Sequence, residues 1–339
     1  MKFDAPRDTK KSPTPPLAKK KFPRSLGEFG PQRQVLDPSP NPSTLALHEQ
    51  HSIFKMASPD QNMPFIRNLA SSDRKLRTQA LTSLQNFLSS RRSTNALGPV
   101  EILKLWKGLY YALWMCDRAI PQQNLCNDLA GLMHQLPRES VIPWLRGFWA
   151  TMAREWASID VLRMEKFLLL VRRVLGASFS WMKREQEGDN GGKKRKKTPS
   201  AEGRWHQDRV DDVLALLQEW PFSTAEEIEA REALVAKGEH RDLVPPTVAA
   251  GLRIHTLDIW VDEAEKVGLV DAEDDQEAPK ILERINALVE ALHKETETTS
   301  VKVRANEALK DDRLPWNKGM VDADADDQDG GGSWDGFDD

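Results

Sequence analysis

Several features that mark secreted and membrane proteins are missing from this sequence. It has 2 cysteines in 339 residues, Cys116 and Cys126. They form neither a CxxC pair nor a disulfide framework, so we expect a reducing compartment and no structural disulfide. The longest apolar run, Leu109 to Cys116, is far shorter than the roughly 18 to 20 residues of a membrane-spanning helix. The N-terminus is charged and proline-rich, so the sequence predicts no membrane anchor and no secretory signal.

The short motifs of phosphate, nucleophile and metal sites are missing too. The sequence contains no GxxxxGK[ST], GxGxxG or GxSxG, which are the signatures of phosphate loops and nucleophilic serines. None of its 7 histidines falls in HExxH or beside a cysteine at zinc spacing. Asp322, Asp324 and Asp326 imitate the start of a calcium loop, but Asp327 replaces its glycine and Ser333 its glutamate. We therefore expect no cofactor, no metal and no catalytic residue.

Charge is present in quantity but is unevenly distributed. The formal net charge of -4 conceals a basic first half and an acidic second half. By segment the net charge is +4 for residues 1–62, +9 for 63–183, +2 for 184–203, -11 for 204–310 and -8 for 311–339. Such asymmetry favours a protein that meets a polyanion with its first half and basic proteins, or nothing, with its second.

Helical periodicity dominates the middle of the chain. The most informative stretch is Pro143 to Leu175, where large apolar residues recur at three- and four-residue steps. The first apolar face consists of Val141, Leu145, Phe148, Trp149, Met152 and Trp156, and the second of Phe167, Val171, Val174 and Leu175. Lys166 and Arg173, seven positions apart, are predicted on the opposite, exposed face of the second helix.

A sequence pattern recurs at the interval of a helical repeat. Trp106-Lys107-Gly108-Leu109-Tyr110 resembles Leu145-Arg146-Gly147-Phe148-Trp149, and the two glycines are 39 residues apart. That interval is close to the roughly 40 to 47 residues of a two-helix solenoid repeat. The predicted fold class is therefore all-α, a HEAT-like α-solenoid of stacked antiparallel helix pairs with disordered termini.

Composition divides the chain into five parts. Residues 1–62 hold 10 of the 21 prolines and several lysines, and are predicted to be a disordered arm. The other predicted parts are a basic helical core (63–183), a disordered basic loop (184–204), an acidic helical part of the same domain (205–310) and a disordered acidic tail (311–339). Within 205–310 we expect one helix to start at Pro245-Pro246 and a helix from Ile281 to Leu292 to close the ordered part.

Two sets of residues allow a catalytic or RNA-stacking interpretation beside a structural one. Glu155 and Asp160 flank the junction of the two central helices, where a paired-carboxylate nuclease site can be imagined. The structural alternative is favoured: Glu155 pairs with a neighbouring arginine and Asp160 caps the helix that starts near Val161. The tryptophans at positions 106, 114, 149 and 156 could stack on bases, but their helical spacing beside leucines favours the core.

Basic residues supply the candidate binding sites. Five consecutive cations, Lys193, Lys194, Arg195, Lys196 and Lys197, indicate a nuclear-localisation or nucleic-acid patch, and the alternative is a solvated loop. Basic residues of the helical core could neutralise phosphates or bind partners, although charged surface residues are common in any protein. These candidates are Arg74, Lys75, Arg77, Arg91, Arg92, Lys104, Lys107, Arg146, Lys166, Arg172 and Arg173.

Three motifs resemble one family of proteins. They are WKGLYYALWMCD (106–117), FWATMAREW (148–156) running into SIDVLRMEKFLLLVRRVL (158–175), and GLRIHTLDIWVDEAEKVG (251–268). Together they are similar to the eukaryotic ribosomal RNA processing protein 1 family, also called the nucleolar protein of 52 kilodaltons family. The likeness covers about residues 63–310 in the same order.

The resemblance implies an all-helical, non-enzymatic assembly factor in the nucleolus. Its expected partners are the precursor of the large ribosomal subunit (the pre-60S particle), the rRNA precursor and other assembly factors, and its expected role is processing in the internal transcribed spacer region. Composition alone does not indicate this. Two competing interpretations stay open: a nuclear helical-repeat adaptor that binds only proteins, and a metal-dependent nuclease.

Overall fold

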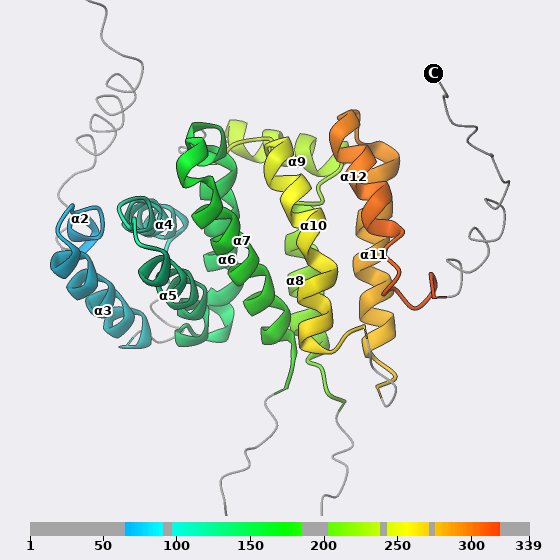
Figure 1. Ribbon diagram of the computed structural model, residues 1–339, viewed down its shortest axis with the longest axis horizontal. Helices are drawn as coiled ribbons and strands as arrows, with labels where there is room; N and C mark the ends of the chain where they lie inside the picture. Colours follow the sequence, from blue (N-terminus) through cyan, green and yellow to red (C-terminus); the bar gives the residue numbers. More distant parts are fainter. Residues whose placement is uncertain (1–64, 91–96, 185–202, 238–242, 271–274, 319–339) are drawn as a thin grey trace, which may run out of the picture. The chain divides into compact units, whose positions relative to one another are not determined.

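The computed structural model describes residues 65–90, 97–184, 203–237, 243–270 and 275–318, which all belong to one compact unit, Asp60–Asp339 (Figure 1). The predicted arm, the basic run Lys193–Lys197 and residues 319–339 lie outside the described residues. The helices are α2 (Phe65–Leu69), α3 (Arg74–Ser90), α4 (Pro99–Trp114), α5 (Ala119–Gly131), α6 (Arg138–Glu155), α7 (Val161–Met182), α8 (Gln207–Glu219), α9 (Ala225–Lys237), α10 (Ala250–Val267), α11 (Ala278–Glu295) and α12 (Thr299–Leu309). Short 3-10 turns follow α5 and α6, η2 (Leu132–Gln135) and η3 (Trp156–Ser158). None of the described helices is long and apolar enough to cross a membrane.

The helices pack in two rows. In one row α2, α4, α6, α8 and α11 touch in that order, and in the other α5, α7, α10 and α12 do so, with α3 reaching this row through η2 (Figure 1). Contacts between the rows join α2 to α3, α4 to α5, α7 to α8 and α11 to α12. The predicted all-α fold of packed helices is therefore confirmed. Each pair contacts mainly its neighbours, as a stack of helix pairs requires.

Two glycines set the spacing within the first row. Gly147 in α6 faces α4, and a Cβ at this position would lie 2.3 Å from Ile102 Cγ2 and 3.2 Å from Trp106 Cδ1. Gly108 in α4 faces α2 in the same way, with its Cβ position 3.2 Å from Leu69 Cδ1. The two glycines of the recurring sequence pattern thus occupy equivalent places, where each lets the next helix of its row approach closely.

The large aromatic residues form the core of this contact. Trp106, Trp149 and Trp156 are buried, as predicted, and Trp114 is half-buried. The Nε1 group of Trp106 donates a hydrogen bond of 2.9 Å to the carbonyl oxygen of Trp144, and the centroids of the two rings are 4.9 Å apart. Buried rings cannot stack on RNA bases. For the three buried tryptophans the core interpretation is therefore confirmed.

The ends of the predicted basic loop are fixed to each other. The amide of Arg184 donates a hydrogen bond of 2.9 Å to the carbonyl oxygen of Arg204. The amide of His206 donates one of 2.9 Å to the carbonyl oxygen of Met182. Residues 184, 203 and 204, predicted as part of the disordered loop, therefore belong to the folded part. The described residues on either side of the segment that contains the run 193–197 are thus bonded to each other, between α7 and α8.

One helix of the second half begins later than predicted. The predicted helix start at Pro245-Pro246 is wrong, because α10 begins at Ala250. The carbonyl oxygen of Pro246 instead accepts a hydrogen bond of 2.6 Å from Nη1 of Arg231 in α9, which holds this segment in the connection. α10 ends at Val267, and the Gly268 that follows has a φ of 79°, the left-handed conformation typical of a glycine after a helix.

The ordered part also extends beyond the predicted last helix. α12 follows α11, and the chain stays packed as far as residue 318. Leu314 is completely buried, and Nη1 of Arg313 lies 2.9 Å from Asp262 and 3.0 Å from Glu265 of α10. The prediction that disorder starts at 311 is therefore wrong for residues 311–318, where a buried leucine and a multiply paired arginine contact the helices.

The substitution Gly147→Ala tests the close approach of α4 and α6. Overpacking of a core usually costs about 1–3 kcal/mol, more than the up to about 1 kcal/mol that alanine contributes to helix propensity. Ile102 cannot yield easily, since Cγ2 is fixed to a branched Cβ in a buried side chain. We expect a lower free energy of unfolding in urea.

The matched control is Gly131→Ala at the end of α5, where an added Cβ meets no atom within 4 Å. This variant should be as stable as the original chain or slightly more stable. Equal stability of the two variants would show that the glycine at 147 is not needed for packing.

Candidate nucleic-acid interface

Basic residues of α6 pair with acidic residues of α8. Nε of Arg146 lies 2.8 Å from both carboxylate oxygens of Glu219. Arg138 pairs with Asp208 and, at 3.2 Å, with Asp212. These pairs are partly exposed, so each adds little stability. Their positive charge is nevertheless neutralised within the molecule and is less able to attract a polyanion.

Arg172 of α7 makes the same kind of contact with α10. Its guanidinium group pairs with Asp262 and, through Nε at 2.7 Å, with Glu263. The side chain of Glu263 is buried, and Nζ of Lys266 also lies 2.6 Å from its Oε1. Arg172 therefore compensates buried negative charge, and its own position is fixed by the helix packing.

The predicted position of Lys166 on an exposed face is wrong. It was expected on the exposed face of α7, yet it is only 5% exposed. Its Nζ donates to the carbonyl oxygens of Trp114 at 2.7 Å and Cys116 at 2.9 Å, and burial lowers its pKa. The last carbonyl groups of a helix lack intrahelical partners, and an ammonium group satisfies them at the end of α4. Lys166 is not accessible to RNA.

Lys107 is also committed to an internal contact. Its Nζ lies 2.6 Å from Oε1 of Glu155 and 5.0 Å from the ring centroid of Tyr111. Burial is the main cause that lowers the pKa of Lys107, and the charge of Glu155 opposes it. The neighbouring candidate Lys104 is half-buried on the same helix.

The two carboxylates of the alternative nuclease interpretation, Glu155 and Asp160, have structural partners. Glu155 is buried and accepts a hydrogen bond of 2.8 Å from Nε of Arg154, which confirms the predicted pairing with a neighbouring arginine. Asp160 precedes α7 as predicted, but its carboxylate pairs with Arg163 and makes no side-chain cap. Nowhere in the described part of the chain do three His, Cys, Asp or Glu residues gather in a way that could hold a metal.

The remaining candidates lie on α7, at the start of α3, or outside the described residues. Arg173 is exposed on α7, beside the paired Arg172. Arg74 and Lys75 are exposed in the first turn of α3, and Arg77 is half-buried there. Arg91 and Arg92 fall in 91–96, outside the described residues, as do Lys193, Lys194, Arg195, Lys196 and Lys197.

Local hydrogen bonds fix the start of α3. Oδ1 of Asp73 accepts a hydrogen bond of 2.7 Å from the amide of Lys75, as an N-cap residue does. Nη1 of Arg77 turns back and donates to the carbonyl oxygens of Ser71 at 2.9 Å and Ser72 at 2.8 Å. One guanidinium group of this turn is therefore held in place by the backbone before the helix.

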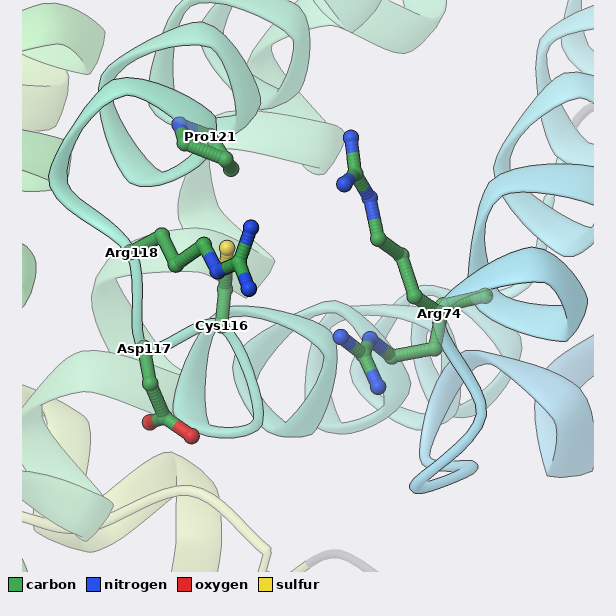
Figure 2. Close-up of a pocket in the computed structure, with 6 residues that line it drawn as sticks. Arg74, Cys116, Asp117, Arg118 and Pro121 are labelled. Carbon is green, nitrogen blue, oxygen red and sulfur yellow. The ribbon is translucent and has the colours of Figure 1, made fainter. Parts of the chain in front are cut away.

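An open hollow lies between this turn and the α4–α5 connection. Its volume is about 310 Å³, and its lining comes from Arg74, Arg77, Cys116, Asp117, Arg118 and Pro121. Figure 2 shows Arg118 reaching from the connection toward the side on which Arg74 stands, while the carboxylate of Asp117 points away. Arg118 is not among the residues predicted from sequence. Only the packing of α3 beside the α4–α5 connection reveals it.

Comparison with known proteins agrees with these observations. The family model described as nucleolar protein, Nop52, matches residues 60–333. Ribosomal RNA processing protein 1 homolog B of Homo sapiens is 31% identical over 207 residues, which are 60% of this chain and 22% of that protein. Homolog A of Mus musculus is 32% identical over 213 residues, 62% of this chain and 35% of that protein. A homolog of Dictyostelium discoideum is 29% identical over 132 residues, 38% of this chain and 25% of that protein.

The matched segment of this chain thus corresponds to only about a fifth to a third of each relative's own length. The family match, in contrast, extends across all the described helices. Together with the three motifs in their expected order, it shows that the chain belongs to the Nop52 family of nucleolar proteins.

Proposed function

We propose that this chain is a non-enzymatic ribosome biogenesis factor of the nucleolus. It serves as a helical scaffold in pre-60S particles and is needed for processing of the rRNA precursor, including the internal transcribed spacer region. The observation that carries the proposal is the family match over residues 60–333. The matched relatives are named ribosomal RNA processing proteins.

The packing of the described residues supports a scaffold. Two rows of helices offer a long exposed surface, and stacked helix pairs commonly bind partners over such a surface. Glu155, the carboxylate considered for nuclease chemistry, is occupied by Arg154 and Lys107. A side chain neutralised in this way is poorly suited to hold a catalytic metal ion.

On this proposal, RNA is bound by the cations that do not pair with groups of the protein itself. Arg173 is exposed on α7, and Arg74 and Lys75 are exposed on α3. The run Lys193–Lys197 serves nuclear import or docking. The alternative is a nuclear adaptor that binds only proteins, for which the same run is directed to the import machinery.

Substitutions of two adjacent arginines distinguish a charge that stabilises the fold from a charge that binds RNA. Arg172→Gln removes a charged partner from buried Glu263, so we expect the free energy of unfolding to fall by about 1–3 kcal/mol. Arg173→Gln should change stability by less than about 0.5 kcal/mol. Its salt slope, the dependence of log affinity for RNA on log salt, should decrease by about 0.7. Urea unfolding and RNA binding at several salt concentrations measure both effects.

The opposite pattern would contradict this division of roles. If Arg172→Gln were as stable as the original chain, its ion pairs would not contribute to the fold. If Arg173→Gln left the salt slope unchanged, position 173 would not contact RNA.

Affinity purification of the tagged chain from nuclear extract tests the function itself. We expect recovery of large-subunit rRNA precursors together with assembly factors. A variant with Lys193–Lys197 deleted should recover less of both if the run serves import or docking. The matched control deletes a stretch of equal length from the acidic tail, which should leave recovery of the precursor unchanged.

Recovery of proteins without precursor RNA would overturn the scaffold and leave the adaptor. Equal recovery by both deletion variants would show that the basic run has no part in localisation or docking.

A further inference from the structure

We propose that the hollow between the first turn of α3 and the α4–α5 connection binds a phosphate group of the RNA backbone. This rests on the proposed function, which it deepens by placing one RNA contact. Three guanidinium groups line the hollow, those of Arg74, Arg77 and Arg118. They come from two elements that are far apart in the sequence.

The three arginines of the hollow differ from several arginines of the described helices that are paired with carboxylates. Arg138, Arg146 and Arg172 each pair with carboxylates. Across the described ranges, by contrast, no carboxylate forms an ion pair with Arg74, Arg77 or Arg118. Like charges gathered without a counter-ion repel each other, and an anion among them relieves that repulsion.

The nearby carboxylates do not neutralise the hollow. Asp117 is a lining residue, but its side chain is 80% exposed and its Oδ1 lies 3.7 Å from Nζ of Lys166. Figure 2 shows this carboxylate directed away from Arg118. Asp73 is engaged with the amide of Lys75. The negative charges thus have other partners, while the guanidinium groups face the hollow.

Helix geometry adds to the positive potential. Arg74 is the first residue of α3, a helix of 17 residues, and Arg118 directly precedes α5, a helix of 13 residues. Neither helix has an acidic residue in its first turn. The N-terminus of a helix carries a partial positive charge, so the start of α5 increases the attraction that the arginines exert on an anion. At the start of α3 the carboxylate of Asp73 offsets this charge.

The chemistry of the lining favours a phosphodiester. A guanidinium group matches phosphate oxygens through paired hydrogen bonds. Arg77 is held by the carbonyl oxygens of Ser71 and Ser72, so part of its ordering cost is met before binding. A volume of about 310 Å³ with an open mouth admits a phosphate that stays linked to its neighbours along a strand. Such contacts position RNA without reading its sequence.

Opposite charge changes at adjacent positions test the proposal. Arg118→Gln removes a cation that has no described side-chain partner, and Asp117→Asn removes the one carboxylate in the lining. With a labelled single-stranded RNA of mixed sequence, Arg118→Gln should weaken binding by about 3- to 10-fold and reduce the salt slope by about 0.7. Asp117→Asn should tighten binding. Arg146→Gln, an equal loss of charge on α6, is the matched control and should have a smaller effect.

All variants are compared as full-length chains with unchanged urea unfolding midpoints. If Arg118→Gln and Arg146→Gln weaken RNA binding equally, the hollow is not a phosphate site, although recovery of rRNA precursors in the purification would leave the scaffold intact. A labelled polyaspartate peptide distinguishes an acidic protein partner. If it binds in an Arg118-dependent way and the RNA does not, the RNA assignment is overturned.

Discussion

In the first row of helices, α4 and α6 approach so closely that Gly147 leaves no room for a methyl group. This approach brings the ring of Trp106 to 4.9 Å from that of Trp144 and lets its Nε1 reach the carbonyl oxygen of the same residue. α6 in turn carries the arginines that meet α8. The position of the second half relative to the first therefore depends on the glycine at position 147, which has no side chain.

The charge that the folded part presents on its surface depends on this packing, and not only on the order of charges in the sequence. The basic half lies against the acidic half, and pairs such as Arg146–Glu219 and Arg172–Glu263 use charge of both signs internally. A count of charges by segment thus overstates the positive field that the folded part presents to a polyanion. Within the described residues, the cations not paired with carboxylates include those in the first turn of α3 and in the α4–α5 connection, and the exposed Arg173 on α7.

Periodicity predicted the helices well where a wide apolar face faces the core, as in α4, α6 and α7, and the repeated glycine pattern indicated their stacking. It placed Lys166 wrongly, because the position of one lysine depends on carbonyl groups that α4 brings to it from fifty residues away. It also missed residues 311–318, where one buried leucine carries the packing. Such features arise from tertiary contacts between unlike segments, which a local pattern does not contain.

The hollow at Arg118 shows the same limit in the binding surface. Arg74 and Arg77 share one turn of α3 and could be selected from the sequence, whereas Arg118 joins them only because α2 packs against both α3 and α4. A scaffold that presents cations on rigid elements loses less conformational entropy on binding than one that presents them on free chain. Arg77, whose guanidinium group is held by the carbonyl oxygens of Ser71 and Ser72, is therefore suited to help set the orientation of an RNA strand at the proposed site.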